Sequence, residues 1–260
     1  MKDLKNIKFW LFDLDNTLYD GATKVFDQVD KKMSKFISEK LKVDLEEARK
    51  IQKNYFQEYN TTLNGMIKNH KIPALAKLQV KAGAVGITAQ KISEAEAIIS
   101  EGGIDDVLIT YNIIGEKKLR ALLDLAKRVK VSVVADSFFC VKGLSKTFKG
   151  AGEPISVLVE CDTGANRCGV TSPHLACELA ELINRSPGLI FGGLMTYPPT
   201  SQAQKINSFL SNAKKLIEAK NIAVNTISVG GSPDMWKVQD IPVATEYRIG
   251  TYIFNDRSLV

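Results

Sequence analysis

Two aspartates near the start of the chain are spaced so that both carboxylates could serve one reaction. Asp13 and Asp15 follow the apolar run 9–12, and turn residues follow them at 16–17. Alternate residues of an extended chain point to the same face, so both side chains would lie on one side of the strand end. There they could share a magnesium ion, or one could act as nucleophile and the other as general acid. The pair predicts a metal-dependent site.

A lysine and two glycine-bearing segments predict a second site with different chemistry. Lys68 ends a short apolar run, and the glycine segments follow the last two candidate strands, at 228–232 and 248–252. Glycine lets backbone N–H groups approach an anion closely, as a phosphate requires. Pyridoxal phosphate needs this combination, because its aldehyde bonds an amine while its phosphate anchors the opposite end.

The elements that must position these residues differ between two parts of the chain. The first part has one apolar strand over 8–18 and then two helical patterns, at 22–41 and 45–59. From residue 66 onward, short apolar runs alternate with amphipathic helices. The candidate strands are 66–68, 84–88, 106–110, 131–135, 156–160, 190–195, 226–229 and 246–254.

This alternation predicts an α/β fold, a (β/α)8 TIM-type barrel preceded by a strand and helices. The strands repeat at roughly the size of a βα unit, and eight of them fit a barrel better than an open sheet. Such a barrel carries its working residues at the carboxyl ends of its strands. Lys68 and both glycine segments stand at such ends.

Composition sets the broad class of the protein. The 260 residues are 45% hydrophobic and 25% charged, as in globular proteins. The net charge of +6 is spread evenly along the chain, so we expect a mixed surface and no nucleic-acid partner. No apolar run reaches membrane-spanning length, so we expect a cytoplasmic protein without a membrane partner. The four cysteines lack a C-x-x-C pair, which disfavours structural zinc.

Residues 7–72 resemble the beginning of a haloacid dehalogenase superfamily (HAD-like) hydrolase, nearest to pyrimidine 5′-nucleotidase-like members. The motif D-x-D-x-T, here Asp13 to Thr17, and the helices after it carry the resemblance. It implies Asp13 as the phosphoryl-accepting nucleophile, Asp15 as the acid/base, Mg2+ as the cofactor and the start of a helical cap at 22–59. The family's later Ser or Thr, Lys and acidic pair are not found in frame, so the phosphoryl charge would lack compensation.

Residues 66–260 resemble the alanine racemase N-terminal-type barrel, fold type III of the pyridoxal-phosphate enzymes. The nearest branch is that of D-threonine aldolase and D-serine dehydratase. The resemblance is carried by the stretches 70–73 (HKIP), 83–86 (GAVG), 90–96 (QKISEAE), 160–164 (ECDTG), 167–170 (RCGV) and 248–256 (RIGTYIFND). It implies pyridoxal 5′-phosphate as the cofactor and a small amino acid as the substrate, and the family also allows a homodimer.

By position, the Schiff-base lysine of that family falls on Lys68, although the Arg-Pro-His that precedes it in the family motif is missing here. The resemblance places Arg167 near the cofactor ring and Tyr197 beside it. It assigns cofactor binding to Ser228, Gly230, Gly231, Gly250, Thr251 and Tyr252. From the residues alone, Lys68 could be solvated, Arg167 could pair with a nearby acid, and Tyr197 could anchor a loop.

The two resemblances meet at 67–72 and indicate a chimera, either a natural fusion or an artefact of how the sequence was assembled. We expect a truncated HAD-like segment over 1–65 and a barrel over 66–260 that lacks its family's C-terminal β domain. Turnover would then be impaired, because that domain supplies catalytic groups in the family. Three functions stay open: a pyridoxal-phosphate lyase or racemase of amino acids, a magnesium-dependent phosphatase, and an inactive chimera.

Overall fold

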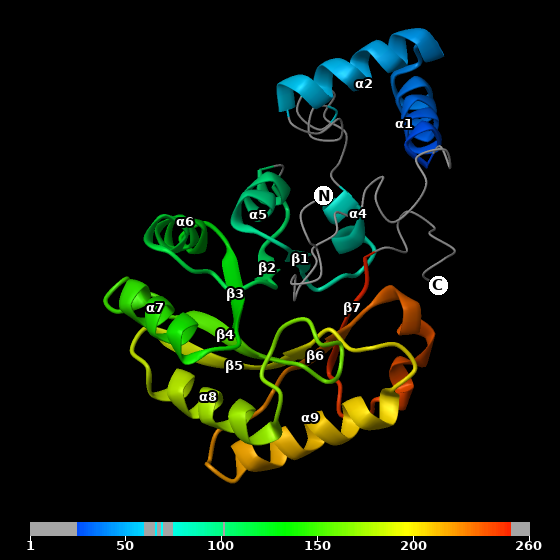
Figure 1. Cartoon of the computed structure of the whole chain (residues 1–260). Helices are drawn as coiled ribbons and strands as arrows, with labels where there is room; N and C mark the ends of the chain where they lie inside the picture. Colours follow the sequence, from blue (N-terminus) through cyan, green and yellow to red (C-terminus); the bar gives the residue numbers. More distant parts are fainter. Residues whose placement is uncertain (1–24, 60–65, 67–68, 70–74, 101, 251–260) are drawn as a thin grey trace, which may run out of the picture. The chain divides into compact units, whose positions relative to one another are not determined.

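The protein is represented by a computed structural model that describes residues 25–59, 66, 69, 75–100 and 102–250. The chain divides into two compact units, Met1–Ile72 and Pro73–Val260 (Figure 1). Asp13, Asp15, Lys68, Thr251 and Tyr252 lie outside the described residues.

The first unit contains two helices that the sequence periodicity predicts. Helix α1 spans Val25–Leu41 and α2 spans Leu45–Tyr59. Between them, the Asp44 carboxylate accepts a hydrogen bond from the N–H of Glu47 at 2.8 Å and so begins α2. Ile37, Ala48 and Met66 are fully buried in one apolar cluster. Met66 is helical, so the predicted strand over 66–68 is wrong at this residue.

The second unit is built on a parallel sheet of seven described strands, which follow one another in sequence order. The sheet curves into a nearly closed barrel (Figure 1). Every strand lies on or beside one predicted from the apolar runs. They are β1 (Ile87–Ala89), β2 (Asp106–Ile109), β3 (Lys130–Ala135), β4 (Ile155–Cys161), β5 (Leu189–Thr196), β6 (Ile227–Gly230) and β7 (Glu246–Arg248).

Helices connect the strands and cover the outer face of the sheet (Figure 1). They are α4 (Leu75–Lys81), α5 (Ile92–Ile99), α6 (Glu116–Ala126), α7 (Phe138–Phe148), α8 (Pro173–Arg185), α9 (Ala203–Glu218) and the 3-10 helix η3 (Ser232–Asp240). Helix α8 shows how the sequence sets such a boundary. Ser172 caps its start by accepting from the N–H of Leu175 at 3.2 Å, and Pro173 stands in its first turn.

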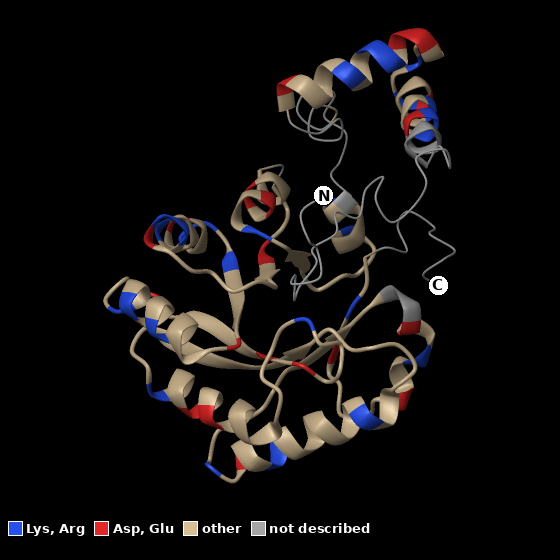
Figure 2. Cartoon of the chain, viewed as in Figure 1, with Lys and Arg blue, Asp and Glu red and all other residues tan. Residues whose placement is uncertain are grey.

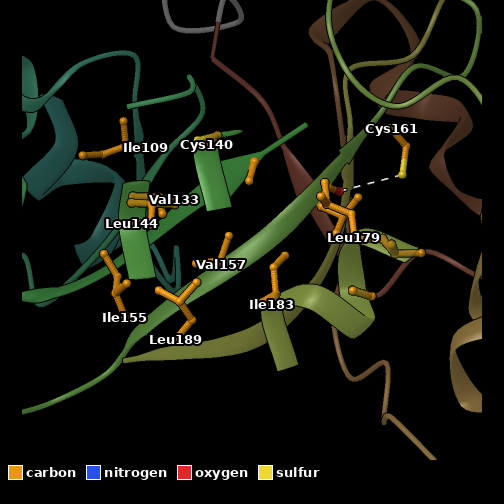
Figure 3. Packing of buried hydrophobic residues seen from close by; sticks show 14 of the residues in the cluster. Ile109, Val133, Cys140, Leu144, Ile155, Val157, Cys161, Leu179, Ile183 and Leu189 are labelled. Carbon is orange, nitrogen blue, oxygen red and sulfur yellow. Dashed lines mark hydrogen bonds between the residues drawn. The ribbon is translucent and has the colours of Figure 1, made fainter. Parts of the chain in front are cut away.

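The sheet is apolar on both faces over most of its length. Alternate residues of the strands, including Ile109, Val133 and Val157, pack with helix residues such as Leu144 and Ile183 in the main core (Figure 3). The residues between them point the other way. There Val134, Leu158 and Met195 form a separate buried cluster, with Leu108 against it. This second cluster fills the inside of the barrel, as the predicted architecture requires.

Many charged residues of the second unit lie on its outer helices. Charged residues of both signs occur in α6, α8 and α9 (Figure 2). Some of these charges pair within one helix, for example Lys214 with Glu218 at 3.7 Å in α9. Among the described helices, none combines the length and the apolar character that a membrane crossing requires.

Candidate functional site

The carboxyl ends of β4 to β7 gather the buried polar side chains of the second unit. Register pairs these strands in order, so that their ends lie next to one another. Within the described residues of this unit, the buried polar side chains are those of Glu160, Thr163, Thr196 and Ser228. All four lie in β4 to β6 or directly after them. The sheet therefore carries a polar end beside an apolar interior.

The loop after β4 is shaped to present Arg167. The Asp162 carboxylate accepts from the N–H groups of Gly164 and Asn166 at 2.9 and 3.1 Å, which closes a tight turn. Gly169 has a φ of +110°, and a Cβ there would lie 2.5 Å from the backbone N of Asp162. Only glycine fits that conformation and that approach.

Arg167 and Tyr197, which the sequence assigns to one site, lie together in the structure. The guanidinium carbon of Arg167 stands 4.3 Å from the centre of the Tyr197 ring. At this distance the cation is attracted to the π-face of the ring. Tyr197 is 40% exposed, so the pair borders open space at the end of β5.

Arg248, at the end of β7, is the most extensively bonded charge in this region. Its Nε donates to the Ser228 hydroxyl at 2.8 Å, and its Nη2 donates to the carbonyls of Thr196 and Ser228 at 2.5 and 3.3 Å. The Ser228 hydroxyl in turn donates to the Glu246 carboxylate at 2.5 Å. Burial lowers the pKa of Arg248 to about 10, against the opposing charges of Glu246 and Glu160.

Glu160 is a carboxyl group inside the barrel end, with only 2% of its surface exposed. The Cys168 thiol donates to its Oε1 at 3.0 Å. Burial raises the pKa of Glu160, and the charge of Asp136 adds to that rise. The Cys168 hydrogen bond and the charges of Arg167 and Arg248 oppose it. Glu160 therefore holds its proton to a higher pH than an exposed glutamate does.

A cleft of about 320 Å³ opens between the ends of β4, β5 and β6. This volume falls within the roughly 300–1,000 Å³ typical of small-molecule sites. Its walls combine backbone-rich glycine segments with an aromatic ring, two prolines and one acid. The lining residues are Gly164, Ala165, Tyr197, Pro198, Pro199, Thr200, Gly230, Gly231 and Asp234.

Two glycines at the end of β6, Gly230 and Gly231, line the cleft with backbone alone. Gly231 has a φ of +119°, which favours glycine as the chain turns into η3. A Cβ on Gly230 would lie 2.9 Å from the carbonyl oxygen of Arg248 and 3.2 Å from its guanidinium carbon. The close packing of β6 on β7 therefore requires glycine at this position.

The structure brings together six residues that the sequence assigned to the site. Tyr197, Gly230 and Gly231 line the cleft, and Arg167 stacks on Tyr197. Ser228 lies in β6, and Gly250 follows the end of β7. Sequence reasoning missed Glu160 and Arg248 as site residues, although both opened stretches that carried the barrel resemblance. The available signal for Glu160 was a charged residue at the end of the apolar run 156–160, and for Arg248 a charged residue at the start of the glycine-bearing segment 248–252.

The site fits pyridoxal phosphate as far as the described residues reach. Gly231 lines the cleft, and a Cβ on Gly250 would meet nothing within 4 Å, so backbone without side chains borders open space at the ends of β6 and β7, as a phosphate requires. Positive charge lies next to two cleft residues, with the Arg248 guanidinium against Gly230 and that of Arg167 on the Tyr197 ring. The cofactor-bonding lysine assigned to Lys68 lies outside the described residues, so its place in the site is not part of this fit. Within the part of the chain described, no cluster of metal-ligating side chains occurs.

Known proteins resemble the chain over most of its length. It is 32% identical over 209 residues to a D-threonine aldolase from Arthrobacter sp, and 32% identical over 202 residues to a 3-hydroxy-D-aspartate aldolase from Paracoccus denitrificans (strain Pd 1222). These matches cover 76% and 73% of this chain but 55% and 52% of the relatives. The chain thus spans about half the length of the curated relatives it matches.

Solved structures and family membership agree with these relatives. The crystal structure of D-threonine aldolase from Filomicrobium marinum matches with a TM-score of 0.62 and 32% identity, over 72% of this chain and 53% of that one. Residues 43–258 match the family described as alanine racemase, N-terminal domain. The match begins inside the segment 7–72 that resembled a phosphohydrolase, so it extends further toward the N-terminus than the predicted barrel. The chain belongs to the alanine racemase N-terminal domain family.

Proposed function

We propose that the chain binds pyridoxal 5′-phosphate and cleaves β-hydroxy-D-amino acids between the α and β carbons. The observation that carries this proposal is the cleft at the ends of β4 to β6, where glycine backbone, an aromatic ring and guanidinium groups converge. Both curated relatives named above are aldolases of such amino acids by name. Dehydration and racemisation of the same substrates use the same cofactor and are the competing reactions.

The chain's own residues divide the binding between two ends of the cleft. In this proposal Gly230, Gly231 and Gly250 hold the phosphate, together with Thr251 and Tyr252. Arg167 stacks on Tyr197 and holds a positive charge beside the cofactor ring or the substrate carboxylate. Pro198 and Pro199 bring apolar surface to the cleft wall.

The cofactor itself supplies the electron-accepting ring that takes up the electron pair of the broken bond. Lys68 is the amine assigned to bond the cofactor. Cleavage of D-threonine would release acetaldehyde as the hydroxyl proton leaves the β oxygen and the carbonyl forms, and glycine once the α carbon has gained a proton in place of the broken bond. A base must accept the hydroxyl proton. Glu160 is too deeply buried to be assigned this role.

The first experiment is to incubate the protein with pyridoxal 5′-phosphate, reduce with borohydride and map the labelled peptide by mass spectrometry. We expect one label, on Lys68, which Lys68→Ala abolishes and Lys71→Ala retains. Label scattered over surface lysines, or none, would overturn the proposal. The loaded protein is then given D-threonine, with L-threonine as the stereochemical control, and acetaldehyde is measured.

A further inference from the structure

Two segments of the chain form opposite walls of the cleft. Residues 197–200 line it from the loop after β5, whereas Gly230, Gly231 and Asp234 line it from β6 and η3. The separation of these two walls sets the size of the space that a ligand can occupy.

Behind the cleft, residues of the same loop and of η3 enclose a small cavity of about 20 Å³. Pro198 and Asp234 line both the cavity and the cleft, so they form the partition between the two spaces. The cavity is large enough for about one water molecule, which means that side chains do not fill this seam. Apolar packing therefore holds the two walls together less tightly than a filled seam would.

Asp234 makes a direct link across this seam. Its Oδ2 accepts a hydrogen bond from the backbone N–H of Ser201 at 2.6 Å. Its Oδ1 pairs with the Nζ of Lys237, three residues further along η3, at 3.6 Å. Ser201 follows directly after the cleft wall 197–200, and a charged acceptor makes such a hydrogen bond stronger than a neutral one. The carboxylate of Asp234 thus holds the end of one wall against the other.

Ser201 has a backbone conformation that needs such a partner. Its φ of +57° lies in the left-handed region, which a serine rarely adopts. A residue in this region costs free energy and persists where its surroundings hold it. Ser201 is exposed, so burial contributes little to holding the turn. The hydrogen bond to Asp234 is the contact that holds it.

We propose that Asp234 is a positioning residue that ties the loop after β5 to η3 and so fixes the ring of Tyr197 in the cleft wall. It acts through Ser201 and not by meeting a ligand, because its two carboxylate oxygens are engaged with Ser201 and Lys237. The consequence for a ligand rests on the proposed function, whereas the link between the walls does not.

Hydrogen exchange at the Ser201 amide, followed by NMR in the full-length chain, tests the link without any cofactor. We expect Asp234→Ala to raise the exchange rate at Ser201 at least about tenfold, the factor for one hydrogen bond to a charged group. Asp234→Asn keeps an acceptor but not the charge, so a rise of about threefold is expected.

The matched control is Asp44→Ala, which removes another carboxylate that accepts a backbone N–H, that of Glu47 at 2.8 Å in the first unit. It should raise exchange at Glu47 and leave Ser201 unchanged. Equal exchange at Ser201 in Asp234→Ala and wild type would overturn the proposal. So would a parallel rise at the Leu175 amide, at the start of α8, since that would mean general loosening. Melting temperatures show whether each variant folds, and if Asp234→Ala does not, the rate in Asp234→Asn decides.

Titration with pyridoxal 5′-phosphate tests the consequence for the cleft. If Asp234 acts through Ser201, Asp234→Ala weakens binding by about threefold to tenfold and Asp234→Asn by less, because the affinity falls with the fraction of chains in which the wall is held. If the charge of Asp234 met the ligand directly, the two variants would change the affinity alike, and the proposal would be wrong. Unchanged affinity in a variant with faster exchange would also overturn it. A wild-type chain that binds no cofactor would refute the proposed function, while exchange at Ser201 would still decide the link.

Discussion

The inner face of the barrel changes character within a single step of two residues. In the middle of the strands it carries Leu108, Val134, Leu158 and Met195, a purely apolar layer. Two residues further along the chain, at the carboxyl ends of the same strands, stand Thr110, Asp136, Glu160 and Tyr197. Strands β6 and β7 add Ser228, Glu246 and Arg248 at that end.

This difference indicates that the apolar layer stabilises the fold and that the polar layer forms the site. Apolar side chains stabilise the barrel by leaving water. Charged groups taken out of water cost free energy even when they are paired, and apolar residues of similar size often serve stability better. The polar layer is therefore a poor device for stability alone. A ligand that binds at the carboxyl end would account for charged groups there. The predictions below test the two layers separately.

The largest effect is expected in the apolar layer. Leu158→Ala should lower the free energy of unfolding by about 2–5 kcal/mol, because Leu158 is 4% exposed and its removal leaves a cavity. Urea unfolding measures this loss. Leu175→Ala is the control, since Leu175 is 38% exposed and should cost far less. Cofactor affinity of the folded variant should stay at the wild-type value, and a loss of affinity would break the distinction between the layers.

At Gly230, which lines the cleft, we expect a smaller loss of stability together with weaker cofactor binding. Gly230→Ala places a methyl group 2.9 Å from the Arg248 carbonyl oxygen, which should cost about 1–3 kcal/mol of stability and displace the guanidinium. Cofactor affinity should fall with it. Gly143→Ala, in the middle of α7, is the matched control and should stabilise by roughly 0.5–1 kcal/mol. Unchanged cofactor affinity in Gly230→Ala would remove β6 from the site.

The sequence predicts most of this fold because a parallel sheet with both faces buried leaves continuous apolar runs such as 131–135 and 156–160. The spacing of apolar residues likewise predicted helices α1 and α2. The run at 66–68 misled because three residues cannot distinguish a strand from one turn of a helix, and Met66 is helical.

The site was less predictable than the fold. The resemblance placed Arg167 and Tyr197 in one site, and the structure brings the two side chains together. The resemblance also assigned cofactor binding to Ser228, and the structure shows its hydroxyl bonded to Glu246 and Arg248. Those partners come from β7, eighteen and twenty residues away in the chain, and pairing across a sheet is not written in local sequence.

The smallest effect expected concerns the charge of Glu160. Its pKa is raised by burial, so the folded chain binds this proton more tightly than the unfolded chain does. The stability that this difference contributes is present below the unfolded pKa, near 4.5, and is lost as the pH rises through the higher folded pKa. Glu160→Gln removes that loss. The free energy of unfolding of the variant, relative to wild type, should therefore rise with pH.

Urea unfolding at pH 4, 6 and 8 checks this sign, with the exposed Glu153→Gln as the control for an equal change of charge. A relative stability that instead falls with pH would mean that Arg167 and Arg248 outweigh burial and that Glu160 is a charged member of an ion-pair network. Because the same two guanidinium groups face the proposed ligand, that result would change the picture of the site as well. Glu160 would then compete with an anionic ligand for them, whereas a protonated Glu160 leaves their charge available for binding.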